Sequence, residues 1–256
     1  MDDLLIEPVP AFKDNYLWLL VRGKRAAIVD PGDAAPVEAR LQRDGLQLDT
    51  IVVTHHHGDH VGGVAELKQR HGARVLGPAG EDIPGRDVAL VEGDRVEVLG
   101  VQMNVIDVPG HTSGHIAYHA PAEGLLFCGD TLFAAGCGRL FEGTAQQMHR
   151  SLSKLARLPG TTRVYCAHEY TLANLKFARA VEPENAALAQ REVTCREMRA
   201  RNIPTVPSTI ADELATNPFL RSNEPAVRRA AERQANGASA DPVATFAAIR
   251  EWKNRF

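Results

Sequence analysis

The chain has 256 residues, of which 44% are hydrophobic and 24% charged, enough apolar material for one large or two smaller globular domains. Its formal net charge of -3 and pI near 6.4 argue against a nucleic-acid-binding protein. No apolar run reaches the roughly 18 residues of a membrane span, and the start MDDLLIEPVPAFKDNY lacks the positive and apolar regions of a secretory signal. We therefore expect a cytoplasmic protein that binds neither nucleic acid nor membrane.

The cysteines agree with that compartment. Cys128, Cys137, Cys166 and Cys195 form no C-x-x-C pair and no compact framework, as expected for reduced thiols. We interpret them as small buried hydrophobic residues. Since no heptad pattern or apolar stripe predicts association, we expect a monomer.

Short apolar runs bounded by turn signals fill the first two thirds of the chain. They predict strands over residues 16–21, 26–30, 50–54, 101–108, 115–120, 124–130 and 162–168. Amphipathic spacing predicts helices over 34–44, 61–71 and 144–158, the last with Thr144 as N-cap. Strands and helices in this order are typical of an α/β or α+β body of layered sheets covered by helices.

After about Tyr170 the strand signals stop. Residues 171–202 are rich in Ala, Leu, Arg and Glu, which favour helix, and a proline-punctuated connector follows over 202–209. Residues 224–234 and 241–256 predict two more helices, each with proline in its first turn. A helical unit is therefore expected after a β-rich one.

Metal-binding side chains crowd the stretch TIVVTHHHGDHVGG. Side chains two apart in extended backbone point the same way, so His55 and His57 can share one ion while His56 faces elsewhere. Asp59 and His60 follow a glycine where the chain can turn into the helix predicted from Val61 onward, which directs them to a neighbouring point. This spacing predicts two adjacent metal sites served by one loop.

Three later strands each end near a further candidate ligand. His111 lies in VIDVPGHTSGH, Asp130 in LLFCGDTLF and His168 in VYCAHEY. A lone histidine at a strand end is usually a satisfied structural residue, but the clustered loop leaves coordination positions to fill. Asp130 has two carboxylate oxygens and can bridge two ions.

The remaining histidines, His71, His115, His119 and His149, are interpreted as structural, with support of a metal ligand as an alternative for His115. Asp30, in IVDPGD, either caps the following helix or orients one of the histidines. The residues leave both hypotheses open.

The motifs THHHGDHVGG, PGHTSGH, GDTLF and CAHEYT resemble, in this order, the metallo-β-lactamase superfamily. Over essentially the whole chain, the sequence resembles the glyoxalase II (hydroxyacylglutathione hydrolase) family. The resemblance lies in the segments FAAGCGRLFEGT, CAHEYTLANLKFARAVEP, NPFLR and the ending IREWKNRF. The resemblance implies an αββα sandwich with a C-terminal α-helical domain. Residues 1–170 would form the catalytic domain and 171–256 a helical domain that binds glutathione.

The resemblance also implies two divalent ions per chain that share one carboxylate, zinc foremost, with iron or manganese as alternatives. The first ion would be held by His55, His57, His111 and bridging Asp130, the second by Asp59, His60, His168 and the same Asp130. Asp59 and Asp130 would then be catalytic, together with a metal-bound hydroxide.

The implied substrate is an S-(2-hydroxyacyl)glutathione, typically S-D-lactoylglutathione, cleaved to glutathione and D-lactate in the second step of methylglyoxal detoxification. Hydroxide would attack the thioester carbonyl, and the thiol, with an unperturbed pKa of about 8.5, could leave as thiolate without a dedicated general acid.

Implied glutathione contacts are Arg139, Phe141, Tyr170, Arg250 and Lys253, with Phe141 standing where some members carry tyrosine. Arg250 and Lys253, three positions apart, share a helix face that can meet carboxylates. The alternative for these two is an ordinary solvated helix face.

Other functions fit the residues less well. A mononuclear iron persulfide dioxygenase of the same superfamily would not use the complete ligand set. A structural metal protein would favour cysteine ligands. A serine or cysteine hydrolase would need a nucleophile motif such as G-x-S-x-G, which the sequence lacks, and a nuclease would need a broad basic surface.

Overall fold

The computed structural model describes residues 3–235 and 241–256. The chain forms two compact units, the first of Met1–Asp107 and Ser113–Gly129, the second of Val108–Thr112 and Asp130–Phe256. In the described residues, helices are too short or too polar to cross a membrane. The division at residues 170 and 171 stays a prediction.

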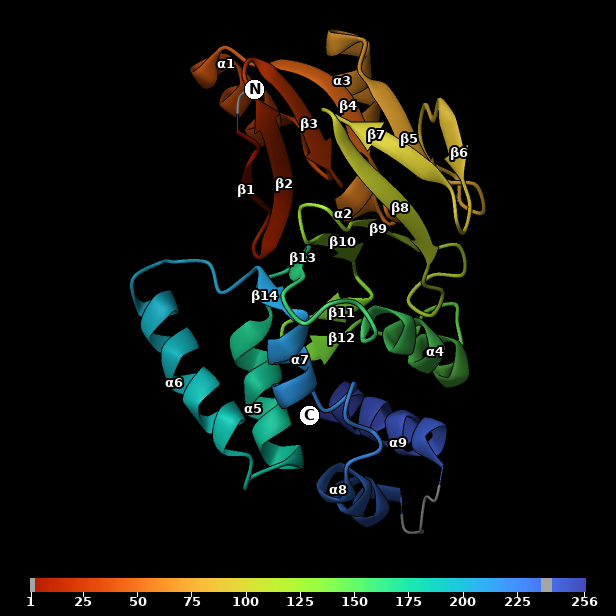
Figure 1. Ribbon diagram of the computed structural model, residues 1–256, viewed down its shortest axis with the longest axis vertical. Coiled ribbons are helices and arrows are strands. Elements are labelled where there is room, and N and C mark those ends of the chain that lie inside the picture. Colours follow the sequence, from red (N-terminus) through yellow and green to blue (C-terminus); the bar gives the residue numbers. More distant parts are fainter. Residues whose placement is uncertain (1–2, 236–240) are drawn as a thin grey trace. The chain divides into compact units, whose positions relative to one another are not determined.

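A mixed sheet forms the first half of the first unit, with strands in the order of the chain (Figure 1). Its strands are β1 (Leu5–Ala11), β2 (Asn15–Arg22), β3 (Arg25–Val29), β4 (Gln47–Val52), β5 (Arg74–Pro78) and β6 (Val88–Leu90). β1, β2 and β3 pair antiparallel, whereas β3 to β6 pair parallel. The parallel part brings the carboxyl end of β3 beside that of β4, which places IVDPGD next to the histidine loop.

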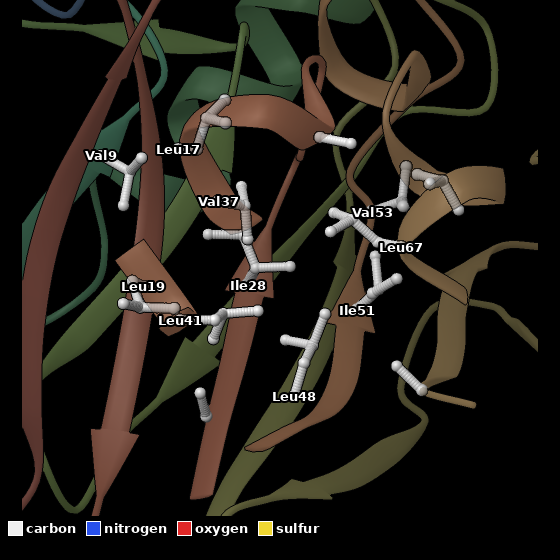
Figure 2. Packing of buried hydrophobic residues seen from close by; sticks show 14 of the residues in the cluster. Val9, Leu17, Leu19, Ile28, Val37, Leu41, Leu48, Ile51, Val53 and Leu67 are labelled. Carbon is white, nitrogen blue, oxygen red and sulfur yellow. The ribbon is translucent and has the colours of Figure 1, made fainter. Parts of the chain in front are cut away.

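Helices α1 (Ala34–Asp44), α2 (Gly58–Val61) and α3 (Val64–His71) connect these strands. Asp33 caps α1 by accepting a hydrogen bond from the Ala35 N–H at 2.9 Å, and Gly45 ends the helix in the left-handed conformation. Helices α1 and α3 cover one face of the sheet, where aliphatic side chains such as Leu19 and Val37 interdigitate (Figure 2). Burial of this apolar face is what holds helices and sheet together.

The second sheet of this unit is an antiparallel run of consecutive strands. They are β7 (Arg95–Val98), β8 (Val101–Asp107), β9 (Ile116–Ala120) and β10 (Leu125–Gly129). The fully buried Tyr118 of β9 donates a hydrogen bond from its hydroxyl to the Val53 carbonyl at 2.8 Å, and the Ile116 N–H donates to the Thr54 carbonyl at 3.0 Å. These bonds tie the second sheet to the segment that leads into the histidine loop.

The second unit is mainly helical. Its elements are the hairpin β11 (Leu132–Phe133) and β12 (Gly136–Cys137), α4 (Ala145–Leu155), β13 (Arg163–Cys166), α5 (Thr171–Val181), α6 (Ala186–Ala200), β14 (Ser208–Thr209), α7 (Ile210–Thr216), α8 (Pro225–Ala235) and α9 (Pro242–Arg255). Thr144 caps α4 in a capping box with Gln147, as its position predicts. Phe177 of α5 contacts the rings of Phe219, Trp252 and Phe256, which packs the last helix onto α5.

The strands predicted from sequence are all present, but the helix predicted over 61–71 is wrong at its start. Helix α2 begins at Gly58, and Gly62 and Gly63 separate it from α3. A Cβ on Gly62 would lie 2.4 Å from the Gly32 carbonyl oxygen, so the loop after β3 packs directly on the break. Gly58 does not adopt a left-handed conformation, so the turn expected there is the start of a helix instead.

Sequence prediction missed strands β1, β5, β6, β7, β11 and β12 and helix α7. It also missed the short β14, in a region expected to hold no strand. β1 carries Pro8 and Pro10, which argue against a strand, yet β1 lies at the edge of its sheet, where a missing N–H is tolerated.

Candidate metal centre and adjoining cavity

His55 and His57 meet in the first unit as their spacing predicts. His55 Nε2 lies 3.1 Å from His57 Nδ1, and the His60 ring centroid lies 4.0 Å from that of His55. His55 and His60 are fully buried. Three imidazoles therefore converge directly after the end of β4.

Asp59 and His60 stand on α2, with His60 Nε2 3.6 Å from Asp59 Oδ2. The buried Asn15, at the start of β2, donates from Nδ2 to the same Asp59 oxygen at 3.1 Å. A Cβ on Gly32 would lie 1.9 Å from the Asp59 carbonyl oxygen, so this position requires glycine. Strand β2 thus positions the Asp59 carboxylate, and the loop after β3 packs against the Asp59 backbone.

Asp30 orients a histidine. Its Oδ2 lies 3.1 Å from His60 Nδ1, while Thr54 donates to Asp30 from its N–H at 2.7 Å and from its hydroxyl at 2.8 Å. The capping hypothesis is wrong, because Asp33 caps α1. Asp30 has φ +51°, a strained backbone for a non-glycine residue. Because the Asp30 carboxylate lies beside Nδ1, Nε2 of His60 is the ring nitrogen on the side of Asp59.

The other histidines of this unit lie outside the cluster or beside it. His115 stacks on His55 with ring centroids 4.5 Å apart, which supports the alternative of a supporting role. His56 turns away and places Nδ1 2.9 Å from Glu81, and His71 pairs with Glu38 at 2.8 Å. Burial lowers the pKa of His119, so a neutral structural side chain fits there.

In the second unit Asp130 stands between two histidines. Its Oδ2 lies 3.4 Å from His111 Nε2 and its Oδ1 lies 3.3 Å from His168 Nε2. His111 Nδ1 is 2.9 Å from the Arg139 carbonyl, which accepts its hydrogen and directs Nε2 toward Asp130. Each carboxylate oxygen therefore faces a different imidazole.

The distances between neighbouring donor atoms are those expected of two ligands of one metal ion. Two ligands bound tetrahedrally at about 2.0–2.1 Å stand about 3.3 Å apart. The pair His55 and His57 and both Asp130 contacts lie between 3.1 and 3.4 Å. Imidazole and carboxylate donors suit zinc, iron and manganese. The donor sets within each unit therefore fit divalent metal ions.

A cavity of about 510 Å³ opens in the second unit beside His111 and Asp130. All the predicted glutathione contacts line it, namely Arg139, Phe141, Tyr170, Arg250 and Lys253. Among its lining residues, the cations outnumber the single carboxylate, that of Asp130. This charge distribution suits a ligand whose anionic groups contact Arg139, Arg250 and Lys253.

Arg250 and Lys253 do not form an ordinary solvated helix face. The Arg250 side chain is buried, with 5% exposure, and donates from Nη1 to the Cys137 carbonyl at 2.8 Å. Lys253 Nζ donates to the Ala173 carbonyl at 3.2 Å. Burial, together with the nearby Arg250 and Arg139 cations, lowers the pKa of Lys253 to about 8.

Tyr170 and Phe141 flank the two histidines of this unit. The Tyr170 ring stacks on His168 with centroids 4.6 Å apart and planes 2° from parallel. Phe141 is 63% exposed, and its N–H donates to the His111 carbonyl at 3.2 Å. The backbone of position 141 therefore holds that of His111, whereas a contact between Phe141 and glutathione stays a prediction.

Sequence reasoning missed several residues of these sites. Asn174 lines the cavity and donates to the Ala134 carbonyl at 3.0 Å, and Asn15 and Glu81 support the histidine loop. Asn174 is a polar residue on the buried face of α5, a signal that could have identified it. Asn15 and Glu81 carry no comparable local signal.

Two family profiles match consecutive parts of the chain: the metallo-beta-lactamase superfamily over residues 13–168 and the hydroxyacylglutathione hydrolase C-terminus over residues 169–256. A hydroxyacylglutathione hydrolase from Pseudomonas aeruginosa (strain LESB58) is 59% identical, covering 98% of this chain and 99% of the relative. One from Cupriavidus taiwanensis is 58% identical, covering 99% of both.

Solved structures show the same fold at lower identity. The BLEG-1 B3 metallo-beta-lactamase has a TM-score of 0.62 at 23% identity, covering 85% of this chain and 99% of its own. ETHE1 from Myxococcus xanthus has a TM-score of 0.65 at 24% identity, covering 99% and 98%. A protein crystallised in a di-iron-bound form has a TM-score of 0.53 at 30% identity, covering 64% and 91%. These neighbours and the helical C-terminus confirm the predicted fold class. The chain belongs to the hydroxyacylglutathione hydrolase (glyoxalase II) family, thioester hydrolases of the metallo-β-lactamase superfamily.

Proposed function

We propose that the protein hydrolyses the thioester of an S-(2-hydroxyacyl)glutathione, typically S-D-lactoylglutathione, to glutathione and D-lactate, the second step of methylglyoxal detoxification. The observation that carries this proposal is the cavity whose wall combines His111 and Asp130 with Arg139, Arg250 and Lys253. Nearly full-length relatives named hydroxyacylglutathione hydrolase support the same reaction.

The proposed metal ligands are those of the family resemblance. One ion is held by His55, His57, His111 and Asp130, the other by Asp59, His60, His168 and Asp130. The distances within each unit support both sets. Zinc is proposed, with iron or manganese as alternatives; a relative crystallised in a di-iron-bound form keeps iron among them.

One group of side chains would hold the metal centre at which the thioester is hydrolysed. Bound divalent ions would supply Lewis acidity there, which lowers the pKa of a coordinated water and favours negative charge on the thioester oxygen. Asp130 and Asp59 orient this centre, Asp59 with the help of Asn15. The glutathione thiol, with an ordinary pKa of about 8.5, departs as thiolate, so its departure requires no general acid.

The cations of the cavity bind the peptide part of the substrate. Glutathione carries two carboxylates, and charge-assisted hydrogen bonds from Arg139, Arg250 and Lys253 match them. Because Arg250 is buried and held at the Cys137 carbonyl, its guanidinium is in position before substrate arrives. Tyr170 and Phe141 contribute contacts beside His168 and His111.

We further propose residues 1–170 as the catalytic domain and 171–256 as the glutathione-binding domain, which the two family profiles, meeting at residues 168 and 169, support. The protein is proposed to act as a monomer in the cytoplasm, where its four buried cysteines, which form no disulfide, suit a reducing environment.

The decisive experiment is turnover of S-D-lactoylglutathione by the purified protein, followed by loss of thioester absorbance, with metal content measured on the same sample. Hydrolysis with about two metal ions per chain would support the proposal. Full metal occupancy without hydrolysis would remove the substrate assignment. Oxygen consumption with glutathione persulfide would then identify a persulfide dioxygenase instead.

A further inference from the structure

Glu81, in the loop after β5, connects two segments that carry histidines. The carboxylate is buried and accepts from both sides. Its Oε2 accepts from the His56 N–H at 2.5 Å and lies 2.9 Å from His56 Nδ1, whereas its Oε1 accepts from the Gly114 N–H at 3.1 Å. His56 stands between His55 and His57, and Gly114 precedes His115.

The second segment also packs tightly against the Glu81 loop. A Cβ on Gly114 would lie 2.5 Å from Glu81 Cγ and 3.0 Å from the Gly80 carbonyl carbon, so only glycine fits. The His115 ring stacks on His55 at 4.5 Å with planes 19° apart. The His55–His57 loop and the Gly114–His115 turn are thus joined twice, once through the Glu81 carboxylate and once through the stacked rings of His55 and His115.

We propose that Glu81 is a positioning residue of the metal centre, whose buried carboxylate holds the His55–His57 loop and the Gly114–His115 turn at a fixed separation before an ion binds. A carboxylate suits this place because it accepts on both oxygens. A glutamine accepts on one oxygen only, so it leaves either His56 or Gly114 facing an NH₂ group. A buried N–H left unpaired is costly, and the loop shifts to relieve it.

The inference rests on His55 and His57 as metal ligands, part of the proposed function, but not on the thioester as substrate. Its test is zinc affinity of the full-length chain, measured by competition with a chromophoric chelator. Supporting groups of this kind change metal affinity by about 10–100-fold. We expect Glu81→Gln to weaken zinc binding by that factor.

The matched control is Glu38→Gln. Glu38 is another buried carboxylate of the same unit that pairs with a histidine, His71, at 2.8 Å. Glu38→Gln should leave zinc affinity within about twofold of wild type. Both variants should lower the thermal midpoint, because each removes a buried carboxylate that accepts hydrogen bonds. With cobalt(II) in place of zinc, the visible absorption band should change in Glu81→Gln and not in Glu38→Gln.

A second variant covers the case in which Glu81→Gln does not fold. Gly114→Ala keeps the carboxylate but pushes a methyl group against it, and should also weaken zinc binding. Wild-type affinity in Glu81→Gln, or in Gly114→Ala, would overturn the proposal, as would an equal loss in Glu38→Gln. A wild-type chain that binds zinc without hydrolysing the thioester would overturn the proposed function alone.

Discussion

Arg250 donates a hydrogen bond from Nη1 to the carbonyl of Cys137, 113 positions earlier in the chain, at 2.8 Å. The bond ties the last helix, α9, to the β11–β12 hairpin, both of which line the cavity. The guanidinium carbon also lies 5.0 Å from the centre of the Phe219 ring. Arg250 therefore holds the wall of the proposed substrate site in place and also contributes a positive charge to it.

Arg250→Met should lower the stability of the fold and weaken substrate binding, which loss of an ordinary surface charge would not do. The Cys137 carbonyl would lose its partner, lowering the free energy of unfolding by about 1–3 kcal/mol. The KM for S-D-lactoylglutathione should rise as well. Urea unfolding and steady-state kinetics measure both. Arg157→Met, at an exposed position of the same unit, is the control; equal stability of the two variants would show that the Cys137 bond contributes nothing.

Asp130→Asn should abolish the shared metal centre. An amide offers one oxygen, so it cannot face His111 and His168 alike with a charged acceptor. We expect fewer than two metal ions per chain and turnover reduced by at least roughly 10²-fold, with an unchanged circular dichroism spectrum. Elemental analysis and the thioester assay check this. Retention of both ions would show that Asp130 does not bridge them.

Lys253→Ala should raise KM about tenfold with little change in kcat, because a charge-assisted hydrogen bond to glutathione is lost. The Lys253 pKa, lowered to about 8, adds a pH dependence. The side chain is a cation below that pH and neutral above it, so wild-type kcat/KM should lose its advantage over Lys253→Ala between about pH 7 and pH 9. A constant ratio of the two across this range would contradict the assignment.

Asp30→Asn should weaken metal binding through His60 by about 10–100-fold. Asparagine tolerates the left-handed backbone that Asp30 adopts, so the change removes the carboxylate without straining residue 30 itself. Asp33→Asn, three positions on, is the control, because asparagine caps a helix as well as aspartate does. Chelator competition on both variants decides whether the Asp30 contact with His60 matters.

Much of this protein could be predicted from local patterns. The H-x-H spacing predicted the meeting of His55 and His57, because it depends only on the alternation of an extended backbone. Helix α1 and the Thr144 cap followed from amphipathic spacing and capping chemistry. The imidazole and carboxylate side chains within these motifs predicted divalent metal ions.

Tertiary structure decided what those patterns left open. It assigned Asp30 to His60 instead of a helix cap, buried Arg250 on a helix face expected to be solvated, and brought Glu81 against His56 and Gly114. It also ended α2 at Gly62, where the backbone of Gly32 packs. The spacing of side chains along a strand or helix, helix capping and the choice of metal-binding side chains depend on residues close together in the sequence, so they can be predicted from it. Contacts between residues 25 to 113 positions apart depend on strand register and helix packing, which only the folded chain determines.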